Sequence, residues 1–236
     1  MAPVVKRRRA TLIALSIGTP LLAAVLLAQA VLPSLAAHRV SDRVARYGTV
    51  KSVHVSALPA IKLLWGSVDS VRIAAGTLTM TPAQIASLLW EARDVHDMTV
   101  TAELARLHVP GLPGGLMVSA IHMEKHGHSV KASATLTQRQ LDDALPRGFH
   151  AEPVASGGGQ VEVHASGGLF GAQASLTALV KPLEGRLVAQ PQGFPFAGIA
   201  TVTLFSDPHL VVESVAVRVL RREPLTYGLS LEAALP

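Results

Sequence analysis

Apolar and polar side chains alternate along most of the chain beyond residue 50. The clearest alternating runs cover residues 52–57, 71–73, 98–104, 130–136, 161–165, 172–180 and 225–231. An alternation with a period of two is typical of strands that bury one face, as in antiparallel sheets. Turn residues separate the runs at Gly111–Gly115, Ser156–Gly159, Gly167–Gly168 and Pro182–Gly185. The pattern predicts a domain rich in antiparallel strands.

The stretch Leu210–Leu220 departs from this alternation because it is apolar at both odd and even positions. A strand that is apolar on both faces is usually covered on both faces. We therefore expect an enclosed strand here, for which a helix and a ligand are the candidate covers.

Two segments carry helix signals. In the first, Thr81 suits the N-cap, Pro82 suits the first helical position and Gln84 completes a capping box. An apolar stripe with helical spacing follows, formed by Ile85, Leu88, Leu89 and Ala92. A helix is predicted over Pro82–Ala92.

The second helix signal has the same design. Thr137 and Gln140 form the capping box, and Pro146 ends the pattern, so a helix is predicted over Gln138–Leu145. Its apolar stripe consists of Leu141, Ala144 and Leu145. The two sites align as T-M-T-P-A-Q-I-A-S-L-L and T-L-T-Q-R-Q-L-D-D-A-L. The similarity indicates either a strand-then-helix unit used twice or two good caps that arose independently.

The N-terminus has the pattern of an export segment. Lys6–Arg9 are all basic, and Ala10–Ala37 contains no charged residue. A basic flank before an apolar stretch is typical of a secretory signal or a signal anchor, with the basic side cytoplasmic. As a helix, this stretch would span roughly 42 Å, more than the ~30 Å hydrocarbon core. Ala28-Gln29-Ala30 also fits a cleavage site, so both an anchored and a released form remain open.

This pattern predicts two parts: a signal peptide or signal anchor over residues 1–37, and a single domain over residues 38–236 that begins with a short polar link, His38–Tyr47. The domain is expected on the outer face of the cytoplasmic membrane or in a periplasm-like space. There is no cysteine, so a core and not a disulfide framework must stabilise it. Lys6–Arg9 supply four of the formal charges of +5, which leaves no electrostatic footprint for nucleic acid.

The candidate catalytic chemistry is limited to one histidine cluster. His122, His126 and His128 lie around Glu124, and imidazole and carboxylate groups at such spacing can hold zinc. A polar hairpin turn with Gly127 at its centre is the alternative, and we favour it, so neither a metal site nor another cofactor is expected. There is no G-x-S-x-G elbow and no phosphate-binding glycine loop. The sequence therefore predicts a protein that is not an enzyme.

Leu58–Gly66 is an apolar bend between two predicted strands. It either packs into the core or lines a lipid groove. If the groove exists, the helix stripes are its other candidate walls. The candidate lipid-binding residues are Leu58, Ile61, Leu64, Trp65, Ile85, Leu88, Leu89, Trp90, Leu141 and Leu145.

The stretch Val53–Ile73, V-H-V-S-A-L-P-A-I-K-L-L-W-G-S-V-D-S-V-R-I, resembles the opening of the LmeA-like phospholipid-binding family of actinobacterial envelope proteins. Members follow an export segment with a V-x-V-x-G-x-P run, a glycine and a second V-x-V strand. Leu179–Gln190 resembles a later strand pair of the family with its P-x-x-G turn. Members often have G-F-P where this chain has A-L-P at 57–59.

The resemblance implies a curved antiparallel sheet wrapped about helices, similar to tubular lipid-binding domains. It further implies phospholipid binding and support of envelope lipid or lipoglycan assembly. Two other functions stay open from the sequence: a membrane-anchored module that steadies an envelope enzyme by contact, and a metal-dependent hydrolase that uses the histidine cluster.

Overall fold

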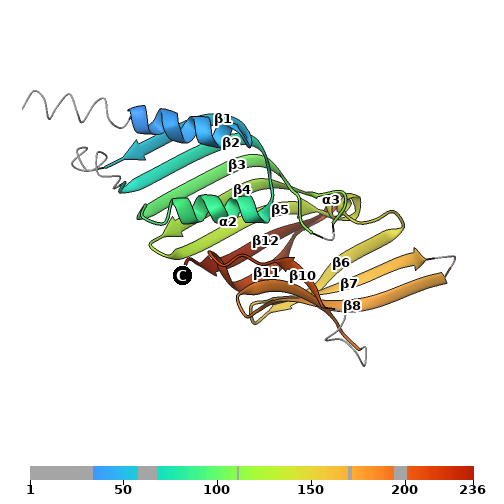
Figure 1. Cartoon of the computed structure of the whole chain (residues 1–236). Coiled ribbons are helices and arrows are strands. Elements are labelled where there is room, and N and C mark those ends of the chain that lie inside the picture. Colours follow the sequence, from blue (N-terminus) through green and yellow to red (C-terminus); the bar gives the residue numbers. More distant parts are fainter. Residues whose placement is uncertain (1–33, 58–67, 111, 170–171, 194–200) are drawn as a thin grey trace, which may run out of the picture.

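The computed structural model describes residues 34–57, 68–110, 112–169, 172–193 and 201–236. These residues form two open, curved sheets, with helices packed on the first sheet and at its end (Figure 1). The fold is therefore mostly sheet with few helices, which confirms the predicted α+β class.

The first sheet has seven strands in the order β1-β2-β3-β4-β5-β12-β11. They are β1 (Gly48–Ser56), β2 (Ser70–Met80), β3 (Asp97–Leu107), β4 (Leu116–His126), β5 (Ser129–Thr137), β12 (Leu225–Ala234) and β11 (Val211–Arg222). All neighbours are antiparallel except β2 and β3, which run parallel. The prediction of purely antiparallel pairing was wrong at this pair, because a helix lies between the two strands in the chain and returns it to the same end of the sheet.

The second sheet has five antiparallel strands in the order β10-β9-β8-β7-β6. They are β6 (Phe149–Gly157), β7 (Gln160–Leu169), β8 (Ala172–Leu183), β9 (Arg186–Pro191) and β10 (Val202–Phe205). Its turns bond to β11: the backbone N–H of Val215 donates to the Gly159 carbonyl (3.0 Å), and that of Val212 donates to the Gly185 carbonyl (2.9 Å). The second sheet thus meets the first at its edge.

Both predicted helices are present, as α2 (Pro82–Glu91) and α3 (Gln138–Ala144). In each, the threonine hydroxyl accepts from the third helical N–H, and the glutamine side chain accepts from the threonine N–H, so both capping boxes form. Each helix ends one residue before its predicted end. The two similar strand-then-helix segments have different positions in the fold. Helix α2 joins two strands of the first sheet, whereas α3 leads from the first sheet to the second.

Residues 34–45 are helical, so the link expected over residues 38–47 is not an extended connection. This helix packs on the first sheet through Ala36, Ala37, Val40 and Val44, which contact the buried core. The expectation of a polar link was wrong because these four small apolar residues have helical spacing, which is difficult to recognise among the many polar residues around them. Within the residues that the structure describes, no helix is long and apolar enough to cross a bilayer.

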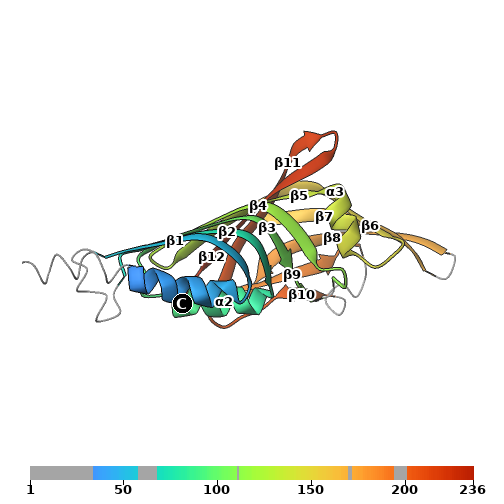
Figure 2. The same ribbon diagram turned by 90° about the horizontal axis from the view of Figure 1, so that it is seen from above.

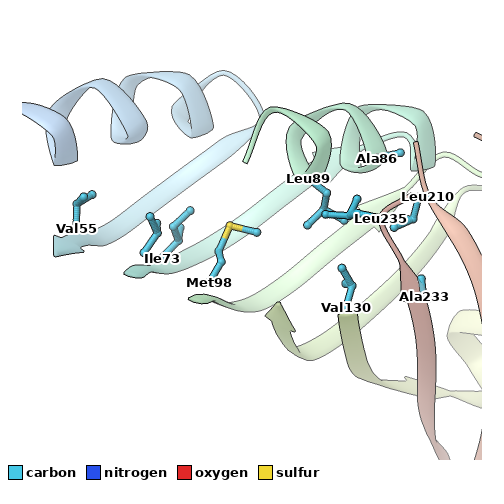
Figure 3. Close-up of a cluster of buried hydrophobic side chains, with 10 residues drawn as sticks. Val55, Ile73, Ala86, Leu89, Met98, Val130, Leu210, Ala233 and Leu235 are labelled. Atoms are coloured by element: carbon cyan, nitrogen blue, oxygen red, sulfur yellow. The ribbon is translucent and has the colours of Figure 1, made fainter. Parts of the chain in front are cut away.

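Two buried clusters fill the space between the first sheet and its helices. The first cluster consists of Val55, Val71, Ile73, Ala86, Leu89, Met98, Val130, Leu210, Ala233 and Leu235. The second cluster consists of Ala75, Leu78, Met80, Ala102, Ala105, Val118 and Leu136. Figure 3 shows Ala86 and Leu89 of α2 above the strands that carry Ile73, Met98 and Val130. The predicted alternating runs supply half of the first cluster, namely Val55, Val71, Ile73, Met98 and Val130, but only Ala102 and Leu136 of the second.

The expectation that Leu210–Leu220 is enclosed on both faces was wrong. Val212 is buried, but Val211, Val219 and Leu220 are 38%, 53% and 48% exposed. β11 is an edge strand that the second sheet meets through turns near its beginning, and the end of the β11–β12 hairpin projects from the sheet (Figure 2). The apolar run therefore ends on the surface.

The Tyr227 side chain connects β12 to α3, and we expect its ionisation at alkaline pH to lower the stability of the protein. It is 1% exposed, and its hydroxyl donates to Gln138 Oε1 (2.7 Å). Burial raises the pKa of Tyr227 to about 12, and the Glu152 and Asp142 carboxylates act in the same direction. Because the raised pKa belongs to the folded state, this stabilisation is complete below the unfolded pKa near 10 and is lost as pH rises toward 12.

We expect the Tyr227 ionisation to lower the free energy of unfolding by up to about 3 kcal/mol over that window. In Tyr227→Phe this part of the loss should be absent, although the variant starts about 1 kcal/mol lower because Gln138 loses its donor. Denaturant titrations of both proteins from neutral pH to about pH 12 measure the difference. Equal alkaline losses in the two proteins would contradict the assignment.

Candidate functional site

The apolar stripe of α2 lies directly on the first sheet. Leu89 is 2% exposed and belongs to the first cluster, while Leu88 is half-buried and packs on the second. Ile85 contacts both clusters. Ala86, which is fully buried, shares this face although the predicted stripe did not contain it. Between them, these residues join the two clusters into one apolar layer under α2.

The candidate residues of α3 reach the same layer only in part. Leu141 packs on the second cluster, as Ile85 and Leu88 do. Leu145 is the C-cap of α3, is half-buried and belongs to neither cluster. The candidate wall formed by α3 is therefore a single residue, Leu141.

Trp90 lies at the polar border of this layer. Its ring packs against the His209 ring at 4.7 Å between centroids, and the Arg93 guanidinium lies over it at 4.8 Å. Stacking on His209 and a cation–π contact fix the indole in place.

Four candidate residues, Leu58, Ile61, Leu64 and Trp65, fall in 58–67, outside the described residues. The residues on either side of this segment are in place. Ala57 is 5% exposed, and Val68 packs on the first cluster. The N–H of Asp69 donates to the Ser56 carbonyl (3.1 Å), which draws the two strand ends together. The residues on either side of the segment therefore lie at the edge of the apolar layer.

The three histidines of the predicted cluster have three different partners. His122 Nε2 lies 2.9 Å from Glu124 Oε1, His126 Nδ1 lies 2.6 Å from Asp97 Oδ1, and His128 Nδ1 lies 3.2 Å from the Leu235 carbonyl. The β4–β5 hairpin turn predicted here is present, with Gly127 at φ 56°. His122, His126 and His128 therefore do not form one ligand set among the described residues.

Sequence reasoning missed a cleft of about 630 Å³, lined by both polar and apolar side chains, on the face of the first sheet away from α2. Its floor carries His122, Lys131, Ser133 and Glu232 from adjacent strands. Lys131 Nζ lies 3.0 Å from Glu232 Oε1. Hydrogen bonds from Lys131 and then Ser214, with the Lys131 charge, hold the pKa of Glu232 below its usual range. The sequence did not reveal this cleft, because polar residues on a strand follow the same pattern whether they line a cleft or a flat, solvent-exposed face.

The surface also carries a basic hairpin end, residues 218–224, which we call the basic tip. It is a run of seven exposed residues that contains Arg218, Arg221 and Arg222 beside Val219 and Leu220. Among the described residues, no ion pair engages the three arginines. Basic and aliphatic groups are therefore presented together on the projecting hairpin (Figure 2).

Comparisons of the chain with models of known protein families, with curated proteins and with solved structures found no match.

Proposed function

We propose that this chain is an extracytoplasmic phospholipid-binding protein of the cell envelope that has no catalytic activity. It works at the outer face of the cytoplasmic membrane, as a form anchored by residues 1–37 or released from them, and supports envelope lipid or lipoglycan assembly. The main support is the apolar layer under α2, which the first sheet and its helices form together. The resemblance of Val53–Ile73 to the LmeA-like family supports the same function.

An acyl chain placed against this layer needs no special motif for affinity. Moving a chain of about 16 carbons out of water is worth on the order of 12 kcal/mol, at about 0.8 kcal/mol per CH₂. The first sheet arches over helix 34–45 and α2, so an apolar concave surface and a helical cover are both present (Figure 2). In the proposed arrangement, α2 and Leu141 border a tubular cleft that holds the acyl chains.

The basic tip is the proposed membrane contact. Arg218, Arg221 and Arg222 suit anionic head groups, and the exposed Val219 and Leu220 can enter the interface beside them. The tip projects from the side of the sheet opposite α2 (Figure 2). A protein that collects lipid from a bilayer must approach it with some surface, and this one combines charge, apolar side chains and projection.

Native mass spectrometry of the purified full-length chain tests the function. The expected result is a population of the protein that carries phospholipid mass and loses it on delipidation. Delipidated protein should recover that mass after incubation with phospholipid vesicles. If neither the purified nor the reloaded protein carries lipid, the phospholipid-binding proposal is wrong, and contact with an envelope enzyme becomes the better explanation.

A further inference from the structure

His96, Asp97 and His126 come together at one end of the first sheet, and no part of the proposed lipid-binding function uses them. Each offers one ligand atom, and the three atoms lie within 4.8 Å of one another. The His96 and His126 rings meet edge to face at 4.7 Å between centroids. We propose that these three residues form a binding site for a divalent transition metal of the zinc type.

The backbone places the three ligands without help from a metal. Asp97 begins β3 and His126 ends β4, and the two are directly paired across the strands. The N–H of Gly127 donates to the His96 carbonyl (2.9 Å), which fixes His96 against the turn that follows His126. Ligand positions that are held by a sheet reduce the ordering that metal binding would otherwise require.

Lys125 fixes the chain just before His96. Its side chain is 1% exposed, and its ammonium group donates to the carbonyls of Arg93 (3.1 Å) and Val95. Burial lowers the pKa of Lys125, while Asp94 and Asp97 act in the opposite direction. The Asp97 side chain is 53% exposed, so its carboxylate is accessible beside the two histidines.

The ligand chemistry selects the class of metal. Two imidazoles and one carboxylate suit zinc and its transition-metal neighbours, whereas magnesium and calcium prefer all-oxygen sites. With zinc bonds of about 2.0–2.1 Å, tetrahedral ligand atoms lie about 3.3 Å apart. His126 Nδ1 and Asp97 Oδ1, at 2.6 Å, lie at hydrogen-bond distance and would separate slightly to admit the ion, while the ligand atom of His96 lies within 4.8 Å of both.

His96 distinguishes the site from a simple ion pair. His126 and Asp97 satisfy one another, but among the described residues no hydrogen bond or ion pair engages the ring nitrogens of His96. All three side chains are exposed, so metal has free access and the fourth coordination position faces solvent. A bound ion would clamp the start of β3 to the end of β4.

Zinc titration of the full-length, chelator-treated chain by calorimetry tests the proposal. We expect one zinc per chain and a rise in melting temperature that the chelator reverses. His96→Ala and His126→Ala should each weaken binding by at least about tenfold. The control is the double variant His122→Ala/His128→Ala, which removes two exposed histidines of the same hairpin and should keep the parent affinity.

Three results would overturn the site. They are no saturable binding up to about 100 µM zinc, parent-like binding in both single variants, and equal weakening in the control. Because all substituted side chains are exposed, melting curves without metal should match the parent and show that each variant is folded. The lipid mass measurement is independent of this titration, so either proposal can fail alone.

Discussion

Replacing Leu88 with serine should remove most of the stabilisation that bound phospholipid gives the protein and lower the stability of the lipid-free protein only slightly. Leu88 is half-buried, so part of its apolar surface is free to face a ligand in the proposed cleft. A ligand present at about 100 times its dissociation constant stabilises the folded state by about 2.7 kcal/mol. For a chain of this size that is a rise of roughly 5–10 °C in melting temperature, which Leu88→Ser should largely abolish.

The matched control is Leu89→Ala on the same helix. Leu89 is 2% exposed and enclosed by the first cluster, so its truncation leaves a cavity that costs about 2–5 kcal/mol. That loss should be similar in delipidated and lipid-loaded protein. Melting curves of both variants in both states separate the two behaviours. If Leu88→Ser lowers both melting temperatures equally, Leu88 is ordinary core and the cleft does not reach it.

The helices could be predicted because their signals are local. Thr81 with Gln84, and Thr137 with Gln140, satisfy helix N–H groups within one turn, so no distant residue has to be known. The small apolar residues of the helix over residues 34–45 resemble a link until the sheet that they contact is known.

The strands could be predicted one by one, but their partners could not. β12 pairs with β5 in the first sheet, although all five strands of the second sheet lie between β5 and β12 in the sequence. The fate of Leu210–Leu220 depended on that order, since an edge strand with a projecting end exposes residues that a central strand would bury. Pairing across long loops depends on the whole sheet, and a single strand does not encode it.

The candidate sites differ in the same way. The apolar stripe of α2 was visible in the sequence because helical spacing reveals it. The ligand set of His96, Asp97 and His126 joins residues from the two ends of one hairpin, and attention to the H-M-E-K-H-G-H run alone missed it. The predicted turn at Gly111–Gly115 could have revealed this set, because a hairpin that turns there pairs Asp97 with His126.

The basic tip should dominate attachment to anionic membranes. Each arginine close to an anionic surface contributes about 1 kcal/mol. Replacing Arg218, Arg221 and Arg222 together with glutamine should therefore cost about 3 kcal/mol, a roughly 100-fold loss of partitioning onto vesicles that contain phosphatidylglycerol. Cosedimentation of the chain from Ser34 onward measures this, since the apolar N-terminal segment would itself enter the vesicles.

A control with the same change in charge separates the tip from net charge. Lys51, Arg72 and Arg106 are exposed on β1, β2 and β3, far from β11 in the strand order. Their joint replacement with glutamine should weaken binding much less, because attraction falls off within a Debye length of about 10 Å at 0.1 M salt. Val219→Ser/Leu220→Ser should weaken binding at high salt as well, where arginine attraction is screened and apolar insertion persists. Equal losses in the two charge variants would mean that the protein approaches anionic membranes through its overall charge and not through the hairpin.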